Sequence, residues 1–167
     1  MTVKKFTLCI LLAVIHFEYY CQTQPTFQKI DQSQGLSSSR ITGIVKEEKG
    51  FVWISTSNGL NRYDGYSLKV YNKQNSNIES NDISSLYLDR KNRIWLTTPG
   101  SGLNLYDRIN DKFISYKNSQ EKEFSIISNR INILTEREDG LFWIGTEKGL
   151  SLFDYDKNTN YISRKDI

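Results

Sequence analysis

Apolar and polar residues alternate in short runs along most of the chain, and one pattern of runs occurs three times. Each copy has an apolar run opened by Trp, a turn that ends in Gly-Leu, and a second run that ends with an aromatic residue and Asp. The copies are Trp53 to Asp64, Trp95 to Asp107 and Trp143 to Asp154. The tryptophans lie 42 and then 48 residues apart, a period typical of arrays of small repeated units.

Each copy belongs to a longer unit of four predicted strands, because alternation with period two and aromatic or β-branched residues favours strands. Strand one begins after a Ser-rich turn, strand two is the Trp strand, and strand three follows a Gly. The first strands are aligned on Ile41, Ile83 and Ile131, and the fourth strands are 68–71, 113–116 and 161–163. A two-residue turn is expected at Asp64-Gly65. Four-stranded antiparallel units in tandem predict the blades of a β-propeller.

The expected fold class is therefore all-β, an incomplete β-propeller of three four-stranded antiparallel blades preceded by a signal peptide. The expected segments are a signal peptide at 1–21, a leader strand and linker at 22–34, and blades at 35–77, 78–125 and 126–167. The leader strand is placed at 27–30. The longer second spacing is explained by extra residues in turns, one of them at 99–101.

Four positions recur in every unit, and we interpret them as structural. The Trp fills the gap between neighbouring blades, the Gly suits a positive φ or a close backbone approach, and the Asp accepts backbone N–H bonds at a strand end. The alternative is an aromatic platform for a ligand. The positions are Trp53, Trp95 and Trp143; Gly59, Gly102 and Gly149; Tyr63, Tyr106 and Phe153; and Asp64, Asp107 and Asp154.

The N-terminus has the pattern of a signal peptide, with Lys4-Lys5 followed by an apolar run over 6–17. The run is shorter than the ~20 residues that cross a bilayer, so we expect export and no transmembrane helix in the mature chain. A buried helix or strand, and lipidation of Cys21, are the alternatives. Cleavage would remove the only histidine, His16, which excludes histidine bases and His-ligated zinc from the mature chain.

Composition adds little chemistry to this picture. Aromatic residues make up 13% of the chain and the net charge is +3, with basic and acidic residues interspersed, so we expect no nucleic-acid surface. Phosphate-binding loops, nucleophile elbows and Ser/His or Cys/His pairs are missing. We therefore expect no catalytic residue, no metal and no cofactor. The acidic pairs Glu47-Glu48 and Glu138-Asp139 are expected to be solvated in turns.

The segment Gly35–Gly65, with its core WISTSNGLNRYD and the two later copies, resembles the two-component regulator propeller repeat. The resemblance covers Phe27 to about Ser163, and it departs at Ser55 and Thr97, where the third copy has Gly145. It implies the periplasmic sensor region of hybrid two-component systems that respond to polysaccharide breakdown products. The kinase, the receiver and the DNA-binding domain of such systems would lie outside this sequence. Since propellers have four to eight blades, three units imply an N-terminal fragment of a longer protein, closed by further blades, or a ring completed by a second copy. On the fragment interpretation, the strand at 27–30 would pair with the last blade.

We therefore expect a non-catalytic, extracytoplasmic ligand-sensing module, and the resemblance implies an oligosaccharide as the ligand. The turns that enter each innermost strand should surround one mouth of the central channel and contact the ligand. Their residues are Ser39, Arg40, Asn81, Asp82, Asn129 and Arg130. The alternatives are that these residues only form turns, that the protein is an exported protein–protein scaffold, or that it is an enzyme on a propeller of the quinoprotein or lyase kind.

Overall fold

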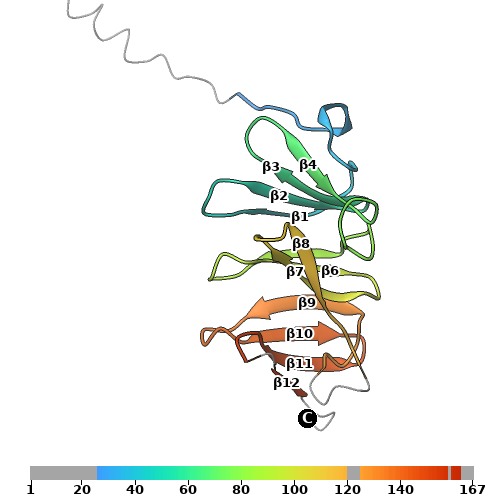
Figure 1. Ribbon diagram of the computed structural model, residues 1–167, viewed down its shortest axis with the longest axis vertical. Helices are drawn as coiled ribbons and strands as arrows, with labels where there is room; N and C mark the ends of the chain where they lie inside the picture. The colour runs from blue at the N-terminus through green and yellow to red at the C-terminus, as the bar shows by residue number, and fades with distance from the viewer. Residues whose placement is uncertain (1–25, 120–124, 158, 163–167) are drawn as a thin grey trace, which may run out of the picture.

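The protein is a stack of three four-stranded antiparallel sheets (Figure 1), which confirms the expected fold class. The computed structural model describes residues 26–119, 125–157 and 159–162. In each sheet the strands are hydrogen-bonded in chain order. The first sheet contains β1 (Ile41–Lys46), β2 (Val52–Thr56), β3 (Gly59–Tyr63) and β4 (Leu68–Tyr71); the second contains β5 (Ser85–Leu88), β6 (Ile94–Thr98), β7 (Gly102–Asp107) and β8 (Lys112–Tyr116); the third contains β9 (Ile131–Glu136), β10 (Phe142–Thr146), β11 (Gly149–Asp154) and β12 (Thr159–Ile162).

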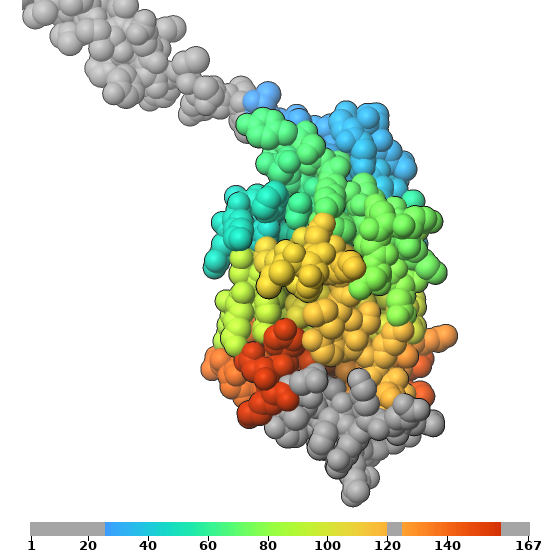
Figure 2. Space-filling view, viewed as in Figure 1, coloured from blue at the N-terminus to red at the C-terminus, as the bar shows by residue number. Residues whose placement is uncertain are grey.

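The core consists of two layers of side chains between successive sheets. The first interface lies between sheets one and two and includes Trp53, Leu60, Tyr71 and Tyr106. The second interface lies between sheets two and three and includes Trp95, Leu103, Phe142 and Phe153. Figure 2 shows the sheets as successive colour bands along the molecule. The first and third sheets therefore each bury one face against the second, which buries both of its faces, as neighbouring blades of a propeller do.

The innermost strands β1 and β5 approach each other closely because a glycine faces the neighbouring sheet. A Cβ on Gly43 would lie 3.1 Å from the Cβ of Leu86 and 3.0 Å from Oγ of Ser55. A side chain at this position would have to push the two sheets apart. Gly43 therefore sets how near the first blade can pack against the second.

The predicted leader strand at 27–30 would pair with the last blade of a closed ring, so it stays a prediction. Residues 26–30 form no strand, and the Phe27 side chain is 94% exposed. Within the described residues no neighbouring strand pairs with this segment, so it has no ladder to join. The chain instead enters a short 3-10 helix, η1 (Gln32–Gln34), capped by the Asp31 side chain. The predicted signal peptide at 1–21 lies outside the described residues. Over the described part of the chain, no helix is long and apolar enough to cross a membrane.

The first strand of the second sheet begins at Ser85 rather than at Ile83, and Pro99 gives the reason. In the other two sheets the residue after the Trp strand donates its N–H to the turn before the first strand. Ser57 N donates to Arg40 O at 3.1 Å, and Glu147 N donates to Arg130 O at 3.2 Å. Pro99 occupies this position in the second sheet and has no N–H. The ladder of the second sheet therefore starts later along the chain.

Two of the three tryptophans are buried as predicted, and the third is not. Trp53 and Trp95 are 0% exposed, whereas Trp143 is partly exposed on the outward face of the third sheet. An arginine guanidinium lies over each indole, with its central carbon 5.5 to 5.7 Å from the ring centroid. The pairs are Arg62 with Trp53, Arg93 with Trp95, and Arg137 with Trp143.

The repeated Asp residues act as predicted. Each carboxylate accepts a backbone N–H in the turn after the third strand: Tyr66 N to Asp64 at 2.8 Å, Ile109 N to Asp107 at 2.9 Å, and Lys157 N to Asp154 at 3.1 Å. The predicted two-residue turn lies one position further along than expected. Asp64 N–H donates to Ser67 O at 3.3 Å, so the central residues are Gly65 and Tyr66.

The repeated Gly residues have the predicted positive φ, which is 125° at Gly59, 80° at Gly102 and 128° at Gly149. A Cβ on Gly59 would lie 2.9 Å from the carbonyl oxygen of Tyr71. Both the positive φ and the lack of a side chain are therefore required where the third strand begins beside the fourth.

Candidate functional site

The turns that precede β1, β5 and β9 lie at one end of the stack, which we call the serine-rich end (residues 37–40, 57–58, 79–84, 99–101, 127–130 and 147–148). In each turn a serine hydroxyl accepts the backbone N–H two residues later, at 3.1, 3.2 and 3.1 Å. The donors are the predicted ligand residues Arg40, Asp82 and Arg130. The serines therefore shape the three turns in the same way, as expected for a Ser-rich turn.

Two of the six predicted ligand residues hold neighbouring sheets together. Asn81 O accepts Gly59 N of the first sheet at 2.7 Å, and its side-chain oxygen accepts Lys73 N at 2.8 Å. Asn129 repeats this arrangement with Gly102 N at 3.0 Å and Asn118 N at 2.7 Å. Both asparagine side chains use their acceptor oxygens for the fold, and the Asn81 amide also donates to Asn58 Oδ1 at 3.3 Å.

The remaining four predicted residues are exposed at the same end. Ser39 and Arg40 precede β1, and Asp82 and Arg130 hold the equivalent positions to Arg40 in the next two units. The Arg130 guanidinium lies 3.5 Å from the Glu147 carboxylate, with 72% of the Arg130 side chain exposed. Among the described residues, neither the Arg40 guanidinium nor the Asp82 carboxylate forms an ion pair. The Arg40 and Asp82 groups are therefore free to contact a ligand, and Arg130 is exposed but paired with Glu147.

An open groove of about 340 Å³ lies at this end, between the second and third sheets. Its lining consists of Ser84, Pro99, Gly100, Arg130, Ile131 and Asn132. Arg130 is the predicted ligand residue that lines the groove, whereas Ser39, Arg40, Asn81, Asp82 and Asn129 do not. Sequence reasoning missed the other five lining residues. The extra residue in the turn 99–101 was the available signal, since it widens the rim at this place.

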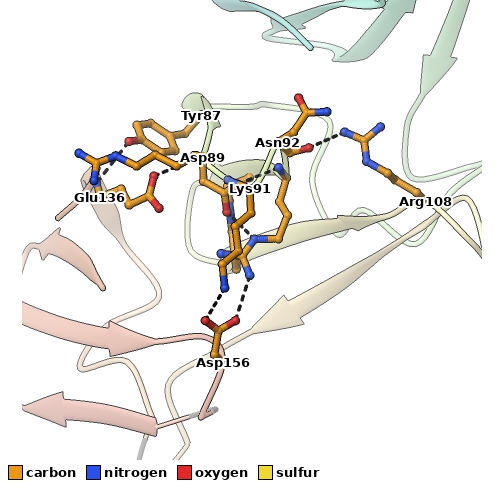
Figure 3. Close-up of polar contacts among 10 residues, drawn as sticks. Tyr87, Asp89, Lys91, Asn92, Arg108, Glu136 and Asp156 are labelled. Carbon is orange, nitrogen blue, oxygen red and sulfur yellow. Dashed lines mark hydrogen bonds and ion pairs between the residues drawn. The ribbon is translucent and has the colours of Figure 1, made fainter. Parts of the chain in front are cut away.

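The opposite end of the stack is organised around the turn between β5 and β6, residues 89–93 (Figure 3). The Asp89 side chain is buried, and its carboxylate accepts Trp95 Nε1 at 2.8 Å and pairs with the Arg93 guanidinium. The same carboxylate accepts the N–H groups of Lys91 and Arg93 at 3.0 and 2.7 Å. A buried charge that is paired and hydrogen-bonded in this way fixes the conformation of its turn.

This turn contacts both neighbouring sheets. Asn92 Oδ1 accepts Glu48 N of the first sheet at 3.1 Å. Towards the third sheet, Arg90 N donates to the Glu136 carboxylate at 2.9 Å, and Lys91 Nζ lies 2.6 Å from the Asp156 carboxylate. The turn therefore links all three sheets by polar contacts at the end away from the candidate ligand groove.

The expectation that Glu47 is solvated is wrong. Its side chain is 1% exposed, and its carboxylate is paired with Arg108 from the loop between β7 and β8. The next sheet covers this turn, so the charge requires a partner. Glu48 is exposed, as expected. A hollow of about 510 Å³ is lined by Arg90 of the second sheet and by Glu136, Arg137, Glu138 and Asp139 of the third, so Glu138 and Asp139 face open space.

The first interface contains a polar cluster centred on Asp111. The hydroxyls of Tyr71 and Tyr106 donate to Asp111 Oδ1 at 2.8 and 2.7 Å, and Lys69 pairs with Oδ2. Burial opposes ionisation of Asp111, but the hydrogen bonds from Lys69, Tyr106 and Tyr71 prevail and lower its pKa to about 2. Burial, supported by these hydrogen bonds, raises the pKa of Tyr71 far above its ordinary value. The cluster is a set of satisfied groups with no free nucleophile.

The described residues contain no group of three or more His, Cys, Asp or Glu side chains placed to hold a metal ion. The buried carboxylates of Asp89 and Glu47 are each paired with an arginine guanidinium within the fold. The chemistry offered by the serine-rich end is recognition through hydroxyls, amides, two guanidinium groups and a carboxylate, all of which pair with hydroxyl-rich ligands.

Comparison with known proteins places this architecture. A family model described as a two component regulator propeller matches residues 77–100. A histidine kinase of Formosa agariphila is 35% identical over 58 residues, which are 35% of this chain and 4% of the kinase. The chain thus spans a small part of that relative.

Solved structures with the same fold include two extracellular domains described as hybrid two-component systems of B. thetaiotaomicron. The first has a TM-score of 0.74 and 26% identity, over 83% of this chain and 20% of that one. The second has a TM-score of 0.64 and 25% identity, over 81% of this chain and 19% of that one. A streptogramin B lyase, at 19% identity and a TM-score of 0.56, shares the fold alone. The resemblance to two-component regulator propeller repeats is confirmed.

Proposed function

Because the chain carries two-component regulator propeller repeats, we propose that it is a non-catalytic, extracytoplasmic part of a sensor that binds an oligosaccharide at the serine-rich end. The propeller fold shared with extracellular domains of two-component systems supports an exported sensor. Signal output would then come from a histidine kinase, which is how the relative from Formosa agariphila is described.

One observation carries the location of the site. The groove between the second and third sheets places the exposed Arg130 guanidinium beside the turn with the extra residue and beside Asn132. A guanidinium presents several N–H donors in a fixed plane, which suits the paired oxygens of a sugar ring or of a uronic acid carboxylate. Exposed Arg40 and Asp82 on the same rim extend the surface available to a longer chain of sugars.

The test is a calorimetric titration of the purified chain with neutral and uronic acid disaccharides and tetrasaccharides. We expect Arg130→Ala to weaken binding by about tenfold or more, since a hydrogen bond to a charged group contributes roughly 1.5–3 kcal/mol. Arg40→Ala should weaken binding of the tetrasaccharide more than that of the disaccharide. Arg90→Ala is the matched control at the opposite end and should leave the affinity unchanged.

Unchanged affinity in both Arg130→Ala and Arg40→Ala, with the oligosaccharide still bound, would remove the serine-rich end as the site. Equal loss in Arg90→Ala would show that the substitutions act through the fold rather than through contact with the ligand.

A further inference from the structure

The turns after β2 and after β10 carry equivalent residues that contact equivalent serines at the serine-rich end. The Ser57 and Ser38 hydroxyl oxygens lie 3.1 Å apart in the first unit. In the third unit, the Ser128 hydroxyl donates to Glu147 Oε1 at 3.2 Å. The third unit therefore places a carboxylate where the first unit has a hydroxyl.

This carboxylate lies beside the arginine of its own unit. The second oxygen of Glu147 is 3.5 Å from the Arg130 guanidinium. The backbone N–H of Glu147 donates to Arg130 O at 3.2 Å, as that of Ser57 donates to Arg40 O at 3.1 Å. The two arginines thus have the same backbone setting, but only Arg130 has a carboxylate beside it, since Arg40 forms no ion pair with the described residues.

The Arg130–Glu147 pair offers both kinds of hydrogen-bonding group to a ligand. A guanidinium only donates, and an ionised carboxylate only accepts. A sugar hydroxyl can accept from Arg130 and donate to Glu147 at once, whereas an anionic ligand group can only accept and would meet a like charge. Both side chains are accessible, with 72% of the Arg130 side chain and 41% of the Glu147 side chain exposed.

We propose that Glu147 is a specificity-determining residue, which makes the groove beside Arg130 accept a neutral sugar hydroxyl and reject a carboxylate or a sulfate group. Building a repulsive group beside an attractive one is a general route to specificity. An anionic group would be accepted at Arg40, which has a serine in place of Glu147. This inference rests on the proposed function, and it narrows the ligand of the groove to a neutral oligosaccharide.

The first experiment uses sulfate as the anion and needs no oligosaccharide. The NMR signals of the Arg40 and Arg130 Nε–H groups are followed while sodium sulfate replaces sodium chloride at constant, low ionic strength. We expect Arg130 to bind sulfate about threefold more weakly than Arg40, the size of effect that an exposed ion pair gives. Glu147→Gln should remove this difference, and Ser57→Glu should weaken binding at Arg40. Lys148, beside Glu147, is kept in every variant.

The second experiment titrates the chain with a neutral and a uronic acid tetrasaccharide in a calorimeter. Glu147→Gln should shift the ratio of the two dissociation constants towards the uronic acid ligand by about threefold or more. Glu138→Gln is the matched control, because it removes the same charge from an exposed side chain at the opposite end. This variant should leave the ratio unchanged.

Two results would overturn the proposal. Equal binding of sulfate at Arg130 and Arg40 in the unsubstituted chain would show that Glu147 does not exclude anions. An equal shift of the ratio in Glu138→Gln and Glu147→Gln would show that net charge, rather than the position of Glu147, sets the preference. Failure of both oligosaccharides to bind the unsubstituted chain would instead refute the proposed function, while the sulfate titration would still decide whether Glu147 excludes anions from Arg130.

Discussion

The two interior interfaces bury equivalent tryptophans in different chemical surroundings. In the first, Trp53 lies against Tyr71 and Tyr106, and its Nε1 is buried with no hydrogen-bond partner among the described residues. In the second, Trp95 Nε1 donates to the buried Asp89 carboxylate. The difference shows that the repeat requires the shape of the indole, whereas the indole N–H forms a hydrogen bond only where a neighbouring side chain can accept it.

The polar groups of the two interfaces are placed differently as well. The first has its carboxylate, Asp111, at the edge of the layer, where it accepts two tyrosine hydroxyls and 40% of its side chain is exposed. The second places Arg93 at the edge of the layer, where it pairs with Asp89 and lies 4.3 Å from the ring centroid of Tyr155. The first interface therefore combines a partly exposed carboxylate with a stacked Trp53–Tyr71 pair, and the second combines the buried Asp89 carboxylate with tilted and edge-to-face rings around Trp95.

The largest effect is expected from truncating the tryptophans. Trp95→Ala and Trp53→Ala should each lower the free energy of unfolding by about 3–5 kcal/mol, as for other buried aromatic residues. Trp95→Ala should cost about 1 kcal/mol more, because it also removes a donor from buried Asp89. Trp143→Ala should cost clearly less than either. Urea denaturation followed by circular dichroism measures all three. Equal losses at the three positions would refute the distinction between interior and outward tryptophans.

An intermediate effect is expected from Asp111→Asn. The substitution weakens the acceptor for two buried tyrosine hydroxyls and should lower stability at neutral pH by about 1–2 kcal/mol, less if solvent screens Lys69, since the Asp111 side chain is 40% exposed. The pKa of Asp111 is lowered to about 2 in the folded chain, against about 3.9 when unfolded. Its contribution is therefore complete above about pH 4 and is lost as the pH falls towards 2.

Thermal unfolding at several acidic pH values tests this prediction. The melting temperature of Asp111→Asn should fall less than that of the unsubstituted chain between pH 4 and pH 2. Asp156→Asn at the rim of the second interface is the comparison. Its carboxyl pKa is also lowered, first by the hydrogen bond from Lys91, but the group is exposed, so its effect should be smaller. A larger effect at Asp156 would place the acid-sensitive contact in the second interface instead.

The smallest effect is expected from Tyr116→Phe in the second interface. Burial, supported by the neighbouring Tyr155, raises the pKa of Tyr116 to about 12, against about 10 in the unfolded chain. The stabilisation is present below about pH 10 and is lost as the pH rises towards 12. Tyr116→Phe should therefore reduce the loss of stability over this range and remove one late step from the ultraviolet titration of phenolate. An unchanged titration curve would show that Tyr116 does not titrate in this range.

Much of the fold could be predicted from the sequence, because the three copies can be aligned with one another. Alternation with period two located the strands, and the Gly and Asp positions located the turns. The errors came where a residue's partner lies in another turn of the chain. Pro99 delays β5 because an N–H is missing in a different turn, and the segment 27–30 stays a predicted strand with no neighbour to pair with among the described residues.

The candidate site was predicted less well for a related reason. The Ser-rich turns lie together at one end of the stack, yet Asn81 and Asn129 bond to the preceding sheet, which no single copy reveals. Glu47 was misjudged because its partner, Arg108, belongs to the next copy. The groove beside Arg130 lies where the second and third sheets meet at the longer turn 99–101. The position of such a groove depends on how two sheets pack together, which the local sequence pattern does not determine.

The arginine over each indole has a consequence for how such repeats diverge. Arg62 comes from the third strand, Arg93 precedes the second strand and Arg137 follows the first, so aligning the three copies places no arginine opposite another. A sequence alignment would show each arginine as unique to its own copy, although all three place a guanidinium near a tryptophan ring. The copies therefore share a cation near the indole, and the arginine that supplies it comes from a different part of the sheet in each copy.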